Sequence, residues 1–438
     1  RSLPSSSEHF GRRGPTPLPS PLPHISAWVG LFHKTAPCFN TGYDSEMESK
    51  ACPSRLGSFS STYAEARSKF VEAAKAIKAY HPRSLDLKGE RGPSGEVLSI
   101  DIAVLGDKSE NPRHIFIHTS GVHGVEGFAG SAVQIDYLRR LKENAKARKR
   151  LENAKGVRII MVHAVNPYGM AWLRKFNENN VDLNRNFHLG SNRHEDMLAP
   201  GKRNKIYPTL HGGLVPAKNA CCDCFYCFLG YNVCRYGYGR AKQGLASGQY
   251  EFKNGLFYGG LRLEPGPQML VEELATMGLS CTNKELFRVL HVDVHTGLGA
   301  FGQDLLLFDD SGLLEPLRAI FGSKYVADPN ASDTAIGTLY ETAGSCDTLA
   351  KQLLANAPSS PTVLSLCQEF GTLNGISVLR AMINEGAWWH ANRSTKPKEP
   401  VKQALLRAFY PDCDKWRASV LHRGAAVFEQ GISYIIGE

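Results

Sequence analysis

The chain has 438 residues, enough for one large domain or two smaller ones with a well-buried core. Its composition, 42% hydrophobic and 21% charged, is that of a globular protein, and no apolar run approaches the roughly 20 residues that span a bilayer. The formal charge of +9 is spread along the chain and not gathered in one stripe. This favours a solvated, mildly basic surface over a nucleic-acid-binding one.

The composition of residues 1–57 predicts a disordered tail. They include the run PTPLPSPLP, contain few acidic residues and bury little apolar surface. Because the first residue is Arg1, we interpret the chain as a fragment or a processed product, with a transit peptide as an alternative. Ordered structure is expected over residues 58–438, as one domain.

Helices and strands alternate through the rest of the chain. A helix is predicted at 61–80, where apolar residues recur at helical spacing behind a Ser or Thr cap, and another at 127–146. Apolar strand-like runs lie at 97–106, 113–121, 156–167, 290–297 and 362–371. This alternation predicts an α/β fold, a single domain with a twisted mixed, mostly parallel sheet flanked by helices.

Residues 190–262 are rich in Gly, Tyr and Cys and predict an irregular insertion, not a separate domain. Cys224 and Cys227 have the spacing of a zinc knuckle, but no second ligand pair follows at a suitable distance, so we favour a chain-specific insertion over a structural zinc. The cysteines suggest no disulfide framework. A reducing compartment, cytoplasmic or organellar, is therefore expected over secretion.

Three of the predicted strands end near His123, His295 and Glu369, and chemistry gathers where the strands of such sheets end. In HTSGVHGVEGFAGS, His123 and Glu126 are spaced i, i+3, so both can face one ion if Glu126 lies in the first turn of the following helix. An ordinary glycine-rich strand-to-helix turn is the alternative. A catalytic zinc needs three protein ligands, and His295 offers the third, with Asp293 beside it as a supporting partner. His118 is interpreted as a strand residue.

Two further segments carry chemistry. In NENNVDLNRNF, Asn184 and Arg185 offer an amide and a guanidinium that can grip a carboxylate, although a satisfied turn network is the alternative. In TVLSLCQEFG, Glu369 ends an apolar strand, where a carboxylate can act as general base and then general acid. A buried Glu paired with Arg, or a helix cap, is the alternative there.

These motifs, in this order, resemble those of the zinc carboxypeptidase family over roughly Val97 to Ile383, with NVDLNRNF the most specific piece. HTSGVHGVEGFAGS, NVDLNRNF, GQYEFKNGLFYGG and DVHTGLG also resemble an uncharacterised branch of that superfamily, named only as a domain of unknown function. The chain is identified as a member of that branch.

The resemblance implies a zinc carboxypeptidase-like fold and one zinc ion held by His123, Glu126 and His295. It implies that Asn184 and Arg185 grip the terminal carboxylate of the substrate. It implies Glu369 as general base, then acid.

Two loop residues also follow from the resemblance. In LYETAGSCDT, Tyr340 is the candidate cap on the bound substrate, and Cys346 falls near the residue that sets side-chain preference. A small uncharged side chain there argues against a preference for basic side chains.

Two departures from the family pattern stand out. The family's arginine that polarises the scissile carbonyl should fall near Asn177, and Arg174, three residues earlier, is the candidate substitute. The chain also carries a large insertion between Phe187 and His291, which can narrow or cover the cleft.

We therefore predict a zinc metallohydrolase that cleaves an amide bond next to a free carboxylate in a peptide or an N-acyl amino acid. A small-molecule deacylase of aspartoacylase type is the nearest alternative, favoured by a closed cavity where peptides favour an open groove. A non-catalytic binding protein that keeps the fold is a more distant alternative, and a basic nucleic-acid-binding module more distant again. Neither a nucleic-acid partner nor a membrane span is predicted.

Overall fold

The structure is a computed structural model that describes residues 53–77, 83–189, 193–215, 224–329, 342–391 and 399–438. All of these lie in one compact unit, Asp44–Glu438. Most of the predicted tail and the predicted substrate cap Tyr340 lie outside the described residues. Within the described ranges, no helix is both long and apolar enough to cross a membrane.

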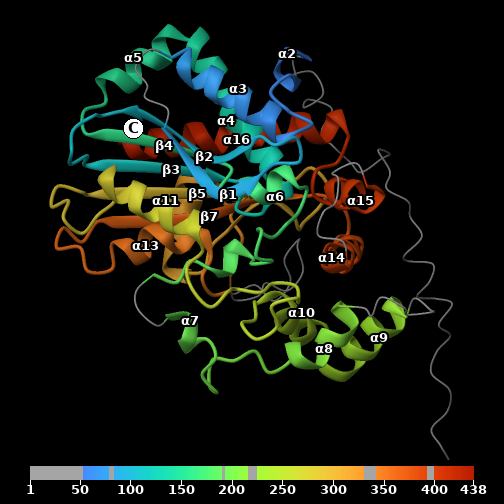
Figure 1. Ribbon diagram of the computed structural model, residues 1–438. Coiled ribbons are helices and arrows are strands. Elements are labelled where there is room, and N and C mark those ends of the chain that lie inside the picture. The colour runs from blue at the N-terminus through green and yellow to red at the C-terminus, as the bar shows by residue number, and fades with distance from the viewer. Residues whose placement is uncertain (1–52, 78–82, 190–192, 216–223, 330–341, 392–398) are drawn as a thin grey trace, which may run out of the picture. The chain divides into compact units, whose positions relative to one another are not determined.

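The described residues form a seven-stranded sheet in the order β1-β2-β4-β3-β5-β7-β6 (Figure 1). Strands β4, β3, β5 and β7 are parallel, whereas β1, β2 and β6 pair antiparallel at the two sides. The predicted mixed α/β sheet, parallel in its centre, is confirmed. The strands are β1 (Arg83–Arg91), β2 (Val97–Gly106), β3 (His114–Ser120), β4 (Val157–His163), β5 (Arg288–Gly297), β6 (Asp304–Leu307) and β7 (Thr362–Gly371).

Burial explains which strands the sequence reveals. Strand β4, VRIIMVH, is buried along its whole length, as expected for a parallel strand covered on both faces. The edge strand β1, RSLDLKGER, is mostly exposed and carries charges in place of an apolar run. For this reason β1 is absent from the predicted elements.

Helices cover both faces of the sheet (Figure 1). The predicted helices appear as α3 (Tyr63–Lys75) and α4 (Gly127–Glu143), which pack with α16 (Asp414–Ile436) over one apolar core. Helices α11 (Pro265–Thr276) and α13 (Leu349–Leu353) lie against a second core. The other helices are α2 (Pro53–Leu56), α5 (Ala145–Asn153), α6 (Pro167–Ala171), α7 (Arg193–Asp196), α8 (Tyr207–Leu214), α9 (Phe225–Tyr236), α10 (Tyr238–Ala246), α12 (Leu314–Phe321), α14 (Gly375–Ala391) and α15 (Pro400–Phe409).

The described part of segment 190–262 is more regular than predicted, because it contains helices α7, α8, α9 and α10. Tyr207, Leu210 and Leu214 of α8 are buried at helical spacing and join an apolar cluster that includes residues of α14 and α15. The abundance of Gly, Tyr and Cys conceals this spacing in the sequence. The insertion is thus packed structure in these ranges, and the prediction of an irregular segment is corrected there.

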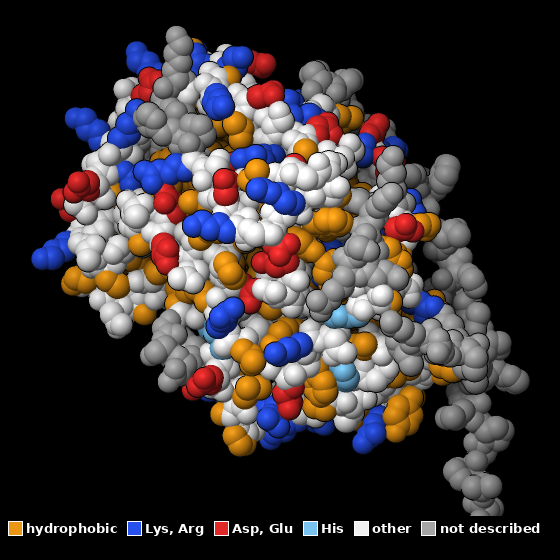
Figure 2. All heavy atoms as spheres, viewed as in Figure 1, with side chains coloured by type: hydrophobic (Ala, Val, Ile, Leu, Met, Phe, Trp, Pro, Cys, Tyr) orange, Lys and Arg blue, Asp and Glu red, His pale blue; other side chains and the backbone are white. Residues whose placement is uncertain are grey.

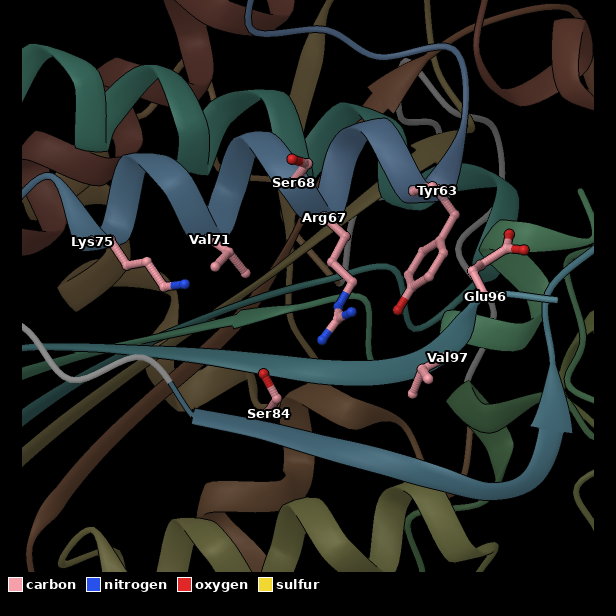
Figure 3. Close-up of a pocket in the computed structure, with 9 residues that line it drawn as sticks. Tyr63, Arg67, Ser68, Val71, Lys75, Ser84, Glu96 and Val97 are labelled. Atoms are coloured by element: carbon pink, nitrogen blue, oxygen red, sulfur yellow. The ribbon is translucent and has the colours of Figure 1, made fainter. Parts of the chain in front are cut away.

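A cavity of about 530 Å³ lies between α3 and the β1–β2 hairpin (Figure 3). Arg67 and Lys75 project into it from the helix, and Ser84 and Val97 from the strands. The Arg67 guanidinium is ion-paired with Asp101 at 2.8 Å, so this wall of the cavity is fixed. The cavity contains none of the predicted site residues.

Basic and acidic side chains are interspersed on the face drawn in Figure 2, with apolar side chains between them. On that face the described lysines and arginines do not gather into one continuous stripe.

Candidate metal centre

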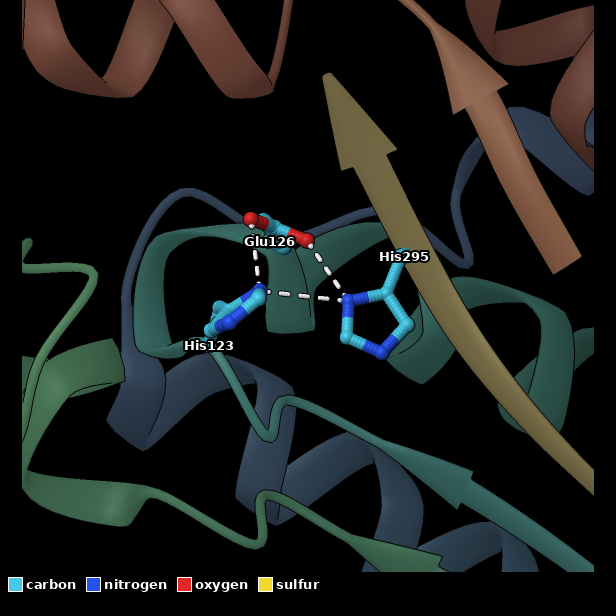
Figure 4. Close-up of side chains that lie close together, drawn as sticks. All are labelled: His123, Glu126 and His295. Carbon is cyan, nitrogen blue, oxygen red and sulfur yellow. Dashed lines mark hydrogen bonds and ion pairs between the residues drawn. The ribbon is translucent and has the colours of Figure 1, made fainter. Parts of the chain in front are cut away.

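The predicted ligands come from two neighbouring parallel strands. His123 lies in the loop after β3, Glu126 closes the short 3-10 turn Gly124–Glu126 that leads into α4, and His295 lies near the end of β5. Since β3 and β5 are paired up to Ser120 and Val294, the loop after β3 meets His295 directly. Figure 4 shows the three side chains turned toward one another.

The three residues bring two imidazole nitrogens and a carboxylate to one point (Figure 4). His123 Nδ1 lies 2.9 Å from Glu126 Oε1, and His295 Nδ1 lies 3.1 Å from Glu126 Oε2. The two Nδ1 atoms are 3.1 Å apart, and all three residues are buried. Two histidines and a carboxylate are a donor set that zinc binds in hydrolytic sites, so the residues fit the metal that the sequence predicts.

A carboxylate backs each histidine. His123 Nε2 lies 3.1 Å from Asp182 Oδ1, and His295 Nε2 lies 2.7 Å from Asp293 Oδ2. The Thr119 hydroxyl donates to Asp293 Oδ1 at 2.6 Å and holds that carboxylate in place. A carboxylate on the far nitrogen keeps a proton there, so Nδ1 is the ring nitrogen that faces the cluster. The predicted contact of Asp293 is present, and Asp182 plays the same part for His123.

The charges of the cluster shift its pKa values. Burial alone raises the pKa of Glu126, but His123 and Lys175 outweigh it and hold that pKa well below its usual range. Burial lowers the pKa of His295, but Asp293 and Glu126 together raise it well above the ordinary value. The cluster therefore favours an ionised carboxylate at its centre.

Glu369 sits beside the ligands, because β7 pairs with β5 so that Glu369 is directly opposite His295. Its Oε1 accepts the backbone N–H of Leu298 at 2.9 Å. Burial and the nearby Glu126 carboxylate raise the pKa of Glu369. The Cys367 thiol lies 3.9 Å from Glu369 Oε2. His295, Cys367 and Glu369 thus form a second group of side chains that could bind a metal ion.

Arg185, which is predicted to bind the substrate carboxylate, already donates hydrogen bonds to carbonyls of the protein. The Arg185 guanidinium donates to the carbonyl of Ala246 through Nε at 3.2 Å and Nη2 at 2.6 Å, and to the carbonyl of Asn184 through Nη1 at 2.7 Å. These bonds use three of its five N–H groups. Arg185 is only 2% exposed, so the segment around Ala246 encloses it.

Cys346 acts on the predicted carboxylate grip through its backbone, not through its side chain. Its N–H donates to Asn184 Oδ1 at 2.8 Å, which leaves the NH₂ group of the Asn184 amide as the donor for a ligand. The Cys346 side chain is fully buried in the core beside α13. This differs from the prediction that the side chain itself meets the substrate.

Arg174 does not reach the cluster, and the prediction that it replaces the family's arginine is corrected. Its guanidinium is fully buried, donates to Glu385 Oε1 and to Asn180 Oδ1 at 2.9 Å each, and stacks over the Trp389 ring at 3.9 Å. The next residue, Lys175, points the other way. Its Nζ lies 2.8 Å from His123 Nδ1 and donates to Glu126 Oε1 at 2.8 Å.

Lys175 is not among the predicted site residues, because the sequence does not show that Arg174 and Lys175 face opposite sides of their loop. The backbone holds this loop on the ligand turn, since Gly124 N–H donates to the carbonyl of Lys175 and Val125 N–H to that of Arg174.

The loop that contains Asp182 and Arg185 is wrapped by residues 246–262. The Asn180 amide donates to the carbonyls of Lys253 and Gly255, and the Asn186 amide donates to that of Gly259. Asp182 N–H donates to the carbonyl of Tyr258 at 2.7 Å. The motifs NENNVDLNRNF and GQYEFKNGLFYGG are therefore one hydrogen-bonded unit, which we call the paired-motif unit.

Comparison with known proteins gives a match at the level of a family. The model of a family described as a protein of unknown function (DUF2817) matches residues 59–423. A search of curated proteins found no match.

Several solved structures are similar in outline. A provisionally assigned metallopeptidase from Shewanella amazonensis SB2B has 13% identity and a TM-score of 0.40, with 86% of this chain and 94% of that chain covered. Thrombin-activatable fibrinolysis inhibitor has 12% identity and a TM-score of 0.42, with 90% and 79% covered. A provisionally assigned carboxypeptidase from Burkholderia mallei ATCC 23344 has 13% identity and a TM-score of 0.38, with 84% and 67% covered. At these values the likenesses assign no activity to this chain.

Proposed function

This chain belongs to the DUF2817 family, and from that premise and the geometry of its buried cluster we propose that it is a zinc-dependent hydrolase of metallocarboxypeptidase type. It would cleave an amide bond next to a free carboxylate, in a peptide or an N-acyl amino acid. The observation that carries the proposal is the convergence of two carboxylate-backed imidazoles and Glu126 on one point, with Glu369 at its side.

One zinc ion held by His123, Glu126 and His295 would supply the Lewis acidity that activates water and polarises a carbonyl. Glu369 moves the proton. Its Oε1 accepts the N–H of Leu298 at 2.9 Å, whereas the Cys367 thiol lies 3.9 Å from Oε2. We therefore assign Oε2 as the oxygen that takes a proton from the attacking water and returns it to the leaving amine.

Asn184 and Arg185 orient the substrate. The Asn184 NH₂ group and the two Arg185 N–H groups not bonded to carbonyls are donors suited to a carboxylate. Holding that carboxylate fixes the amide bond before the chemistry begins. Tyr340, which lies outside the described residues, stays the candidate cap that the family resemblance implies.

A small-molecule deacylase is the second candidate, and the enclosure of Arg185 favours it. Helix α10 ends at Ala246, whose carbonyl lies on the guanidinium. A small N-acyl amino acid can be enclosed as a whole, whereas a peptide must extend out of the site on its acyl side. The two candidates share the metal, the base and the grip, and differ only in the length of the acyl part of the substrate.

The test is metal analysis of the purified chain together with a screen of peptides and N-acyl amino acids. We expect about one equivalent of zinc, and turnover that falls by about 10²–10⁴ in Glu369→Gln, which keeps the ligands but removes the base. The exposed Glu315→Gln is the matched control and should keep full activity. A chain that binds no zinc and turns over neither class of substrate would overturn the proposal.

A further inference from the structure

Lys175 is fixed at both ends to the turn that carries two of the ligands. Its carbonyl accepts the N–H of Gly124, which lies between His123 and Glu126 in the chain. Its ammonium lies 2.8 Å from His123 Nδ1 and 2.8 Å from Glu126 Oε1. The side chain is buried, with the ammonium 5.1 Å from the centre of the Phe409 ring.

The two atoms that Lys175 contacts are the atoms that would face the metal. Asp182 holds the N–H of His123 at Nε2, so Nδ1 presents its lone pair, and that lone pair accepts from the ammonium. A zinc ion sits at about 2.0–2.1 Å from such a nitrogen. An ammonium at hydrogen-bond distance from the same nitrogen would then lie beside a divalent cation in a buried site, where like charges repel strongly.

We propose that Lys175 and the metal compete for His123 and Glu126, so that Lys175 weakens metal binding and withdraws its ammonium when the metal is held. The inference rests on the proposed metal centre. The four-carbon side chain gives the ammonium the freedom to withdraw while the backbone of Lys175 stays on the turn.

The two nearby arginines, Arg174 and Arg185, are not placed to do this. The Arg174 guanidinium is held by Glu385 on the far side of the loop, and the Arg185 guanidinium is held by the Ala246 carbonyl. Lys175, by contrast, contacts both His123 and Glu126. Once withdrawn, its ammonium remains beside the cluster, where it can stabilise negative charge that develops on the substrate.

The test compares the zinc affinity of Lys175→Met with that of the unaltered chain, by competition with a chromophoric chelator. We expect the variant to bind zinc about 10–100-fold more tightly, the size of effect that groups outside the ligand shell have on metal affinity. Its turnover should fall even though the metal is held better. Lys175→Arg keeps the positive charge and should not gain affinity. The exposed Lys108→Met is the matched control.

The visible absorption of the cobalt-loaded protein checks that the ligand geometry survives the substitution. If Lys175→Met does not fold, Lys175→Gln provides the same neutral side chain with a polar end. Unchanged or weaker zinc binding in a folded neutral variant overturns the competition while leaving the proposed function intact. A chain that binds no metal with Lys175 in place overturns both.

Discussion

At the scale of single residues, the carboxylates behind the two histidines decide which nitrogen of each ring faces the cluster. Asp293 is fixed from both sides, by Thr119 on Oδ1 and by His295 on Oδ2. Without it, the His295 ring can turn or carry its proton on the nitrogen that should bind the metal. The two buried aspartates are therefore needed for the cluster although neither belongs to it.

Replacing Asp293 by Ala should lower zinc affinity by about 10–100-fold, because the ring it orients loses its fixed tautomer. The direction is opposite to that expected for Lys175→Met, so the same chelator competition distinguishes a supporting group from a competing one. The exposed Asp412→Ala serves as the control. Unchanged affinity in Asp293→Ala would show that packing alone orients His295.

Residue patterns were sufficient to predict His123, Glu126, His295 and Glu369 as neighbours, because parallel strands place their ends at one edge of the sheet. They were insufficient at Arg174. In this irregular loop one residue, Arg174, forms a buried ion pair with Glu385, and the next one, Lys175, contacts the cluster. The contact between Arg185 and Ala246 could not be predicted either, because the acceptor is a backbone carbonyl, which every residue type has.

At the scale of elements, Arg174 joins the loop after α6 to helices α14 and α15. Glu385 of α14 accepts from the Arg174 guanidinium at 2.9 Å and also from the Lys402 ammonium of α15. Burial lowers the pKa of Lys402 to about 8, and Glu385 opposes that shift. Two buried cations thus share one carboxylate, which fixes the loop that presents Lys175.

Arg174→Met should destabilise the fold by roughly 3–5 kcal/mol, because it leaves part of a buried ion network unpaired. The measurement is urea unfolding, with Lys175→Met as the comparison. If Arg174 only supports the loop, its loss should change zinc affinity much less than the substitution of Lys175 does. A variant that keeps its stability but loses activity would instead return Arg174 to the catalytic role that the sequence suggested.

Some helices and strands were not predicted, because their sequence patterns are weak. Helices α8 and α10 were hidden by glycine and tyrosine, although α8 buries one face at helical spacing. Strand β1 was hidden by its charges. The two helices and the strand lie at the periphery, where an element is buried on one side only and its apolar pattern in the sequence is weak.

At the scale of the whole molecule, two neutral histidines in the core couple folding to pH. Burial lowers the pKa of His163 to about 4 and that of His118 to about 3, from an ordinary value of 6.5. His163 stacks on Phe70 with ring centres 4.6 Å apart, and its Nδ1 has no hydrogen-bond partner among the described residues. A proton on either ring would be costly in the native state.

The sign follows from these pKa values. Between pH 6.5 and about 4 the unfolded chain binds a proton at residue 163 that the native chain does not bind. Stability from this residue is therefore complete above pH 6.5 and is lost as the pH falls. We expect His163→Gln to reduce the difference in unfolding free energy between pH 7.5 and pH 4.5 by roughly 2–3 kcal/mol. Identical pH profiles in urea unfolding would contradict a buried neutral histidine.

The sheet as a whole was the most predictable feature, because short apolar segments such as those of β3 and β4 alternate with helices along the chain, and a parallel sheet covered on both faces buries them. The motifs also predicted membership of an uncharacterised family, and this prediction is confirmed by the match to the DUF2817 family model. Packing of the insertion on the motifs was not predictable, since it depends on contacts between segments about 60 to 80 residues apart.

The paired-motif unit has a consequence for how this protein can change over generations. Asn180 and Asn186 donate to backbone carbonyls of residues 246–262, so replacing either asparagine leaves carbonyls of that segment unpaired. A lineage that shortened the insertion would have to rebuild the loop that carries Asp182 and Arg185 at the same time. The two motifs should therefore be inherited, altered or lost together, and their joint presence in a relative is a stronger mark of common descent than either alone.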